Sequence, residues 1–172
     1  MDIETLKKQM PDLFEMVKKD VRKIIGRQRA GLSLGLVDMG ISPSGFIGGM
    51  FFSGGTMILM NTTALNTLID EINEKQEKPD DIVIAYVYHI LMHEYIHSLG
   101  FLDEFTCREV TKHITKQLFS EDNPVYVMAD RGIGHYFPDF TYAPAGYSFQ
   151  PNPSEIELIE GFDRSSTWSY YS

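Results

Sequence analysis

The chain has 172 residues, of which 43% are hydrophobic and 23% are charged. This length and composition predict one soluble globular domain, residues 1–172, and exclude a disordered or fibrous chain. The formal net charge of −9 argues against a surface that binds nucleic acid, because phosphate backbones favour dense Lys and Arg.

The N-terminal region, residues 1–30, mixes apolar and basic side chains at helical spacing. It predicts one or two helices whose cations face solvent. It begins with MDIETLKK, which has no apolar run typical of a secretory signal. The chain's single cysteine, Cys107, cannot form an internal disulfide, and we expect it to be a small buried hydrophobe. These features predict a reducing, cytoplasmic setting without a membrane.

Two predicted strands follow, Leu32–Asp38 and Thr56–Asn61, with a glycine-rich strand, Gly45–Phe52, between them. A glycine-rich strand lets another backbone approach closely. An added extended peptide would form main-chain hydrogen bonds with it. The candidate substrate-binding residues are Gly48, Gly49, Met50 and Phe51. The alternative is a plain hairpin with a flexible tip.

A helix over Ala64–Glu74 is predicted next, and a polar link joins it to a second helix over residues 79–100. The second helix is apolar almost all round, which predicts that it is buried. Asp80 or Asp81 is the expected N-cap, and Gly100 is expected to end the helix.

The second helix carries the motif H-E-x-x-H at His93, Glu94 and His97. Residues four apart share a helix face, so both imidazoles can bind one ion. Glu94 lies on an adjacent face, where it can miss the metal and still reach a water bound to it. The motif therefore predicts a catalytic zinc site with Glu94 as general base.

Catalytic zinc needs a third protein ligand. A sharp turn at Gly100 would bring Asp103 or Glu104 under the metal, and Glu109 on the following helix is a further alternative. His89 lies about 12 Å along the helix from His97, too far to share the ion. We expect His89 to be a core histidine or one that supports the ligands.

The stretch HEYIHSLGFLDE, from His93 to Glu104, resembles the H-E-x-x-H-x-x-G-x-x-D/E pattern of minimal zincins, which are small bacterial and archaeal proteins. It also resembles the metzincin peptidase pattern, with aspartate in place of the third histidine. The resemblance implies Asp103 as third ligand, one Zn²⁺ per chain and hydrolysis of a peptide or protein substrate. The implied fold is α+β, zincin-like, with a small twisted mixed sheet on a buried metal-binding helix.

Downstream, Thr106–Phe119 predicts another helix. Metzincins place a methionine turn beneath the metal, and Met128 is the candidate here. His135 and Tyr136 are candidate cleft residues, where either could stabilise an oxyanion. Residues 150–172 form a predicted tail that is either mobile or lies across the cleft.

Two other functions remain as alternatives. One is a catalytically silent or self-inhibited zinc-binding protein with a zincin fold. The other is a metal-dependent endoribonuclease of the kind that carries H-x-x-x-H-x-x-G-x-x-H. That family lacks a glutamate after the first histidine, whereas this acidic chain has Glu94 and carries Asp103 in the last place.

Overall fold

The computed structural model describes residues 1–41, 45–75, 77–138 and 152–164. Helix α1 (Ile3–Ile25) occupies the basic N-terminal region as a single helix. It begins where the Asp2 side chain accepts a hydrogen bond of 2.8 Å from the Thr5 amide. It ends at Gly26, whose φ of 69° is the left-handed conformation that glycine adopts without strain.

The sheet is mixed and has the strand order β2-β3-β1-β4. Strands β1 (Ser33–Val37) and β3 (Met57–Asn61) are parallel, and β2 (Gly49–Phe51) runs antiparallel to β3. The glycine-rich strand is shorter than predicted. Gly45 and Gly54 flank it with φ values of 125° and 81°, which are incompatible with a regular strand. The α+β class is confirmed.

Helix α2 (Thr62–Lys75) follows β3 directly, and helix α3 (Pro79–Ser98) carries the H-E-x-x-H motif. The predicted aspartate N-cap of α3 is wrong. The cap position is Lys78, without a side-chain hydrogen bond, and Asp80 and Asp81 lie in the first turn. The reason is Pro79, whose fixed φ suits the first helical position. The two acids stabilise the helix dipole instead.

Helices α4 (Glu104–Leu118) and α5 (Pro124–Arg131) follow, and a short 3₁₀ helix, η1 (Ile133–His135), comes after them. A helix takes the place of the predicted methionine turn, because Met128 lies within α5. Asn123 accepts a 2.9 Å hydrogen bond from the Val125 amide, and Pro124 occupies the first helical position. Both are strong signals for helix initiation.

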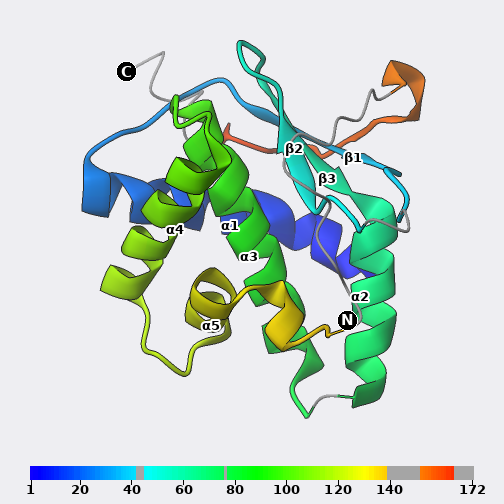
Figure 1. The fold of residues 1–172 in the computed structure, drawn as a ribbon. Coiled ribbons are helices and arrows are strands. Elements are labelled where there is room, and N and C mark those ends of the chain that lie inside the picture. The colour runs from blue at the N-terminus through cyan, green and yellow to red at the C-terminus, as the bar shows by residue number, and fades with distance from the viewer. Residues whose placement is uncertain (42–44, 76, 139–151, 165–172) are drawn as a thin grey trace.

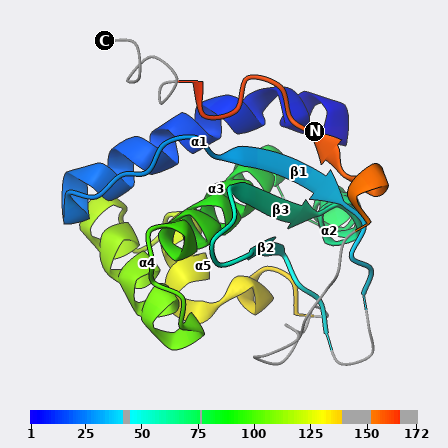
Figure 2. The same ribbon diagram turned by 90° about the horizontal axis from the view of Figure 1, so that it is seen from above.

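Helix α3 lies at the centre of the fold (Figures 1 and 2). It contacts α1, α2, α4, α5, β2 and β3. The apolar surface on all its sides is therefore used, and the prediction that this helix is buried is confirmed. None of the helices in the described part of the chain is long and apolar enough to cross a membrane.

The C-terminal segment packs on the side of the sheet away from β2 (Figure 2). After the 3₁₀ helix η2 (Pro153–Glu155), strand β4 (Glu157–Leu158) pairs antiparallel with β1. The Phe162 ring stacks on Phe14 of α1, with 4.0 Å between ring centroids. Residues 152–164 of the predicted tail thus pack on β1 and α1. The rest of that tail, 150–151 and 165–172, lies outside the described residues.

Candidate metal centre

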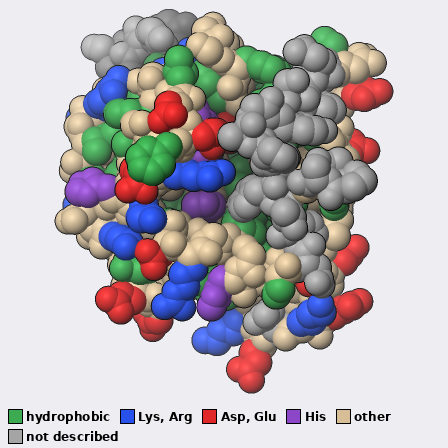
Figure 3. All heavy atoms as spheres, viewed as in Figure 1, with side chains coloured by type: hydrophobic (Ala, Val, Ile, Leu, Met, Phe, Trp, Pro, Cys, Tyr) green, Lys and Arg blue, Asp and Glu red, His purple; other side chains and the backbone are tan. Residues whose placement is uncertain are grey.

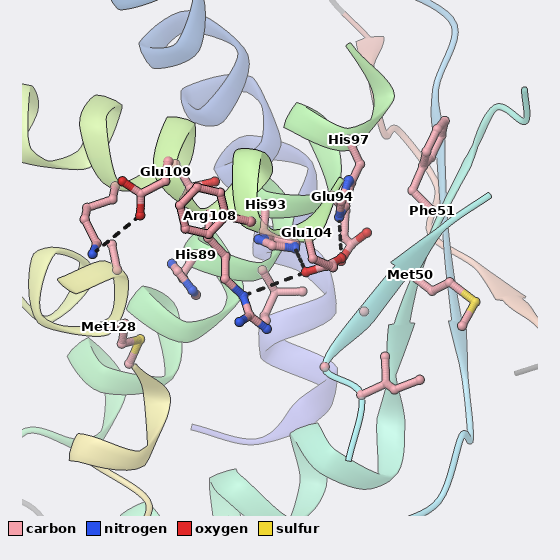
Figure 4. A pocket seen from close by; sticks show the side chains of 18 of the residues that line it. Met50, Phe51, His89, His93, Glu94, His97, Glu104, Arg108, Glu109 and Met128 are labelled. Atoms are coloured by element: carbon pink, nitrogen blue, oxygen red, sulfur yellow. Dashed lines mark hydrogen bonds and ion pairs between the residues drawn. The ribbon is translucent and has the colours of Figure 1, made fainter. Parts of the chain in front are cut away.

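The two motif histidines converge on one carboxylate (Figure 4). The His93 and His97 rings lie 4.8 Å apart between centroids and are nearly perpendicular. His97 Nε2 is 2.7 Å from Glu104 Oε1, and His93 Nε2 is 3.3 Å from Glu104 Oε2. Three side chains that could bind a metal, two at the end of α3 and one at the start of α4, therefore place their donor atoms close together.

The backbone turn after α3 fixes the orientation of His97. Gly100 has a φ of 106°, which a residue with a side chain would adopt only with strain. The turn places the Phe101 carbonyl 2.7 Å from His97 Nδ1. The Nδ1–H group donates to this oxygen, which leaves Nε2 as the atom for a metal.

Two arginines hold the C-terminal end of α3. Arg27 donates a 2.5 Å hydrogen bond to the Leu99 carbonyl, and Arg29 donates one of 2.8 Å to the Ser98 carbonyl. Carbonyls at a helix end lack partners within the helix, and cations also complement the dipole there. The sequence predicts solvent-exposed cations in this region, whereas these two stabilise the end of the motif helix.

Cys107 lies against His93. Its thiol donates to the His93 carbonyl at 3.2 Å, and its sulfur is 3.7 Å from His93 Nδ1. It is fully buried, as predicted. Donor atoms of Cys107, His93 and His97 also lie within 4.8 Å of one another, a grouping that can hold a metal ion. Cys107 follows Glu104 by three residues, and this helical spacing is the sequence signal for a shared face.

The electrostatics of this cluster favour a cation. Burial lowers the pKa of His93, but hydrogen bonds with Cys107 and Glu104 outweigh it and raise the pKa to about 10. Burial, Cys107 and Glu104 act in the same way on His97, whose pKa rises to about 11. The two histidines hold the pKa of Glu104 well below its usual range. The same neighbouring groups that stabilise protons on the two histidines would stabilise a divalent cation in their place.

Glu94 is buried beside the histidines, with 5% of its surface exposed. Its Oε2 atom has no hydrogen-bond partner among the described residues, and burial raises the pKa of this carboxyl. A buried carboxylate oxygen is costly unless it is paired. A metal with a coordinated water would give Oε2 a partner, so the residues present fit a zinc site.

Asp103 and Glu109 have other partners. The Asp103 side chain caps α4 and accepts hydrogen bonds from the Thr106 amide at 2.7 Å and the Thr106 hydroxyl at 2.5 Å. Glu109 lies 3.9 Å from the Lys112 amine. The structure therefore brings Glu104 to the histidines, whereas the resemblance implies Asp103. Aspartate is a preferred N-cap residue, and Asp103 stands immediately before the first residue of α4.

A pocket of about 840 Å³ opens beside the cluster, and its lining includes His93, Glu94, His97 and Glu104. Charged and histidine side chains gather on this face of the molecule, over α3 and α4 (Figure 3). Strand β2 and the residue before it form another part of the wall, where all four candidate substrate-binding residues line the pocket: Gly48, Gly49, Met50 and Phe51.

The glycine pair lets β2 lie directly on α3. A Cβ atom on Gly48 would be 2.8 Å from Ile90 Cδ1. A Cβ atom on Gly49 would be 2.9 Å from Ile90 Cγ2 and 3.2 Å from Glu94 Cγ. These separations are shorter than van der Waals contact, and at Gly49 the Leu59 carbonyl oxygen, 3.0 Å from the added Cβ, cannot move aside, so a side chain there would disturb the observed approach.

The remaining candidates divide between the pocket and the surface outside it. Met128 is buried and lines the pocket from α5. His89 also lines it, one turn before His93, and burial lowers its pKa to about 3. His135 and Tyr136 stack edge to face at 5.0 Å between centroids, and the described lining of the pocket contains neither.

Comparison with known proteins gives no match, since no family model, curated protein or solved structure matches this chain.

Proposed function

We propose that the chain is a zinc-dependent peptidase of zincin-like architecture, in which His93, His97 and Glu104 hold one Zn²⁺. This proposal rests on the approach of both histidine Nε2 atoms to one carboxylate. Beside them lies a buried oxygen of Glu94 that has no hydrogen-bond partner among the described residues. Two imidazoles and a carboxylate are a ligand set that catalytic zinc sites use.

When bound, zinc supplies a water whose pKa is lowered to about 7 and a Lewis acid for the substrate carbonyl. Glu94 accepts a proton from the attacking water and returns it to the leaving amine. Burial raises the pKa of Glu94, which makes this carboxylate a stronger base near neutral pH. The Phe101 carbonyl keeps the His97 ring in the orientation that presents Nε2.

Strand β2 supports a peptide as the substrate. It is the terminal strand of the sheet in the described residues and pairs on one side with β3. Its residues also line the pocket. An extended peptide can pair with the other edge through main-chain hydrogen bonds, which would place its backbone beside the metal ligands.

The test is the substitution Glu94→Gln. We expect the variant to retain zinc, because Glu94 is not a ligand in this proposal. Hydrolysis of an unstructured protein or peptide library should fall by about a hundredfold or more, the usual contribution of a general base. Zinc content is measured by elemental analysis of the same preparations used for the rate measurements.

Two results would count against the proposal. Full hydrolysis by Glu94→Gln would contradict the mechanism, and loss of zinc from this variant would show that Glu94 is a ligand. The matched control is Glu109→Gln. It removes the same charge from a residue that pairs with Lys112 at 3.9 Å, and it should leave zinc content unchanged.

A second candidate is a metal-binding protein without hydrolytic activity. The observation that favours it is the proximity of Cys107 to both histidines, because a thiolate ligand would help to close the metal site. Cobalt substitution separates the two candidates. A strong sulfur-to-cobalt charge-transfer band that Cys107→Ser abolishes would favour the closed site. A spectrum typical of cobalt bound only by oxygen and nitrogen atoms would favour the peptidase.

A further inference from the structure

The pocket extends beyond the metal cluster into a region lined by basic side chains. Arg108 and Lys112 lie one helical turn apart on α4 and both line the pocket. His89, one turn before His93 on α3, lines it as well. These three residues, called here the basic subsite, are separate from the proposed zinc ligands and from Glu94.

The Arg108 side chain reaches between His89 and Glu104 (Figure 4). It is 63% exposed, and its Nε atom lies 3.8 Å from Glu104 Oε2, too far for a hydrogen bond. In the described part of the chain this is its one ion pair. If Glu104 binds a metal, the planar guanidinium has its donors available, and its geometry suits a carboxylate.

The acidic residues near the basic subsite do not neutralise it. Glu109 lies 3.9 Å from Lys112, a distance that leaves the lysine's donors available. Asp130 pairs at 2.9 Å with Lys116, which is outside the described pocket lining. Of the other carboxylates that line the pocket, Glu94 and Glu104 belong to the metal cluster, where zinc would offset their charge, and Asp103 caps α4.

His89 adds a polar side chain to the wall of the basic subsite. Its Nδ1 atom is buried and has no hydrogen-bond partner among the described residues. Because burial lowers the pKa of His89 to about 3, the ring is neutral at physiological pH. A neutral imidazole can donate one hydrogen bond to a bound group and accept another.

We propose that the basic subsite binds a carboxylate of the peptide substrate, an inference that rests on the peptidase function proposed above. Arg108 is one helical turn, about 5.4 Å of rise, from Glu104. That spacing suits a carboxylate on the residue next to the scissile bond, since adjacent Cα atoms are about 3.8 Å apart. The carboxylate comes from a chain terminus or from an acidic side chain.

The experiment compares four versions of one short neutral peptide with wild-type protein and Arg108→Gln. The first two versions end in a free carboxylate or an amide, and the other two are amidated and carry Glu or Gln beside the cleavage site. Hydrolysis is followed as kcat/KM. Binding to zinc-loaded Glu94→Gln protein, with and without Arg108→Gln, is followed by calorimetry.

Wild-type protein should favour one carboxylate version over its amide by about tenfold or more, the contribution of a charged hydrogen bond. Arg108→Gln should reduce that ratio to about one, and Arg108→Lys should retain part of it. Whichever pair shows the preference identifies the source of the carboxylate. The control is Lys116→Gln, which removes the same charge from the same helix outside the pocket and should keep the wild-type ratio.

Equal rates and affinities for carboxylate and amide in the wild type would overturn the inference while leaving the peptidase proposal intact. An equal loss on all four peptides in Arg108→Gln would also overturn it. If no peptide is cleaved but the carboxylate versions bind more tightly through Arg108, the peptidase proposal fails and the basic subsite stands.

Discussion

Asp103 and Glu104 are adjacent carboxylates with different partners. Asp103 accepts hydrogen bonds from Thr106 at the start of α4, whereas Glu104 meets the two histidines. A carboxylate engaged by a helix N-terminus loses a stabilising contact if it turns to a metal. This local competition favours Glu104 as the ligand.

Substitutions at these two positions separate the roles. Glu104→Gln should weaken zinc binding by more than about a hundredfold, because even residues that only orient ligands cost about 10- to 100-fold. Asp103→Asn should leave zinc affinity unchanged, since asparagine caps helices about as well as aspartate. Competition with a zinc chelator measures both affinities, and the reverse ranking would return the ligand role to Asp103.

At the scale of elements, the approach of β2 to α3 determines the shape of the pocket. This approach depends on Gly49, where an added Cβ would lie 2.9 Å from Ile90 Cγ2 and 3.0 Å from the Leu59 carbonyl oxygen. The backbone oxygen cannot turn away as a flexible side chain can. A side chain at position 49 therefore pushes the strand away from the helix.

Gly49→Ala should lower the free energy of unfolding by about 1–3 kcal/mol, the usual cost of overpacking. The matched control is Gly134→Ala. A Cβ atom there meets nothing within 4 Å, and Gly134 is not among the glycines with positive φ. Its effect should stay within about 0.5 kcal/mol. Urea unfolding measures both, and equal effects would contradict the close-approach argument.

Elements were also predictable from sequence to different degrees. The apolar run and the helix-ending glycine located α3 to within two residues at its C-terminal end, because both signals are local. Helix α5 was missed, although Asn123 and Pro124 stand at its start. Its eight residues are too short to show a clear helical period, and the resemblance to metzincins suggested a turn instead.

At the scale of the whole molecule, Asp163 ties the C-terminal segment to the N-terminal half. It is 3% exposed and adopts a φ of 56°. Its carboxylate accepts a 2.8 Å hydrogen bond from the Leu32 amide and pairs with the buried Lys18 amine of α1. This contact joins α1, the start of β1 and the end of the described chain.

Asp163→Asn should lower the free energy of unfolding by about 1.5–3 kcal/mol, the range for hydrogen bonds to charged groups. Asparagine tolerates the left-handed conformation, so backbone strain should add little. The neighbouring control is Arg164→Gln, which breaks an exposed pair with Asp12 and should cost less than about 1 kcal/mol. Thermal melting followed by circular dichroism compares the two variants. A similar loss of stability in both would contradict the larger contribution expected of the buried Asp163 contacts.

The sequence by itself determined the α+β class, the buried motif helix and the pairing of His93 with His97, because helical period and residue spacing act over a few neighbouring positions. The tertiary structure alone decided that Glu104 faces the histidines, that Arg108 enters the pocket beside His89, and that residues 152–164 pack on β1 and α1. These contacts join residues on different helices and strands, even where the residues are close in the chain, as His97 and Glu104 are. They depend on how the helices pack against one another and against the sheet, which no local pattern specifies.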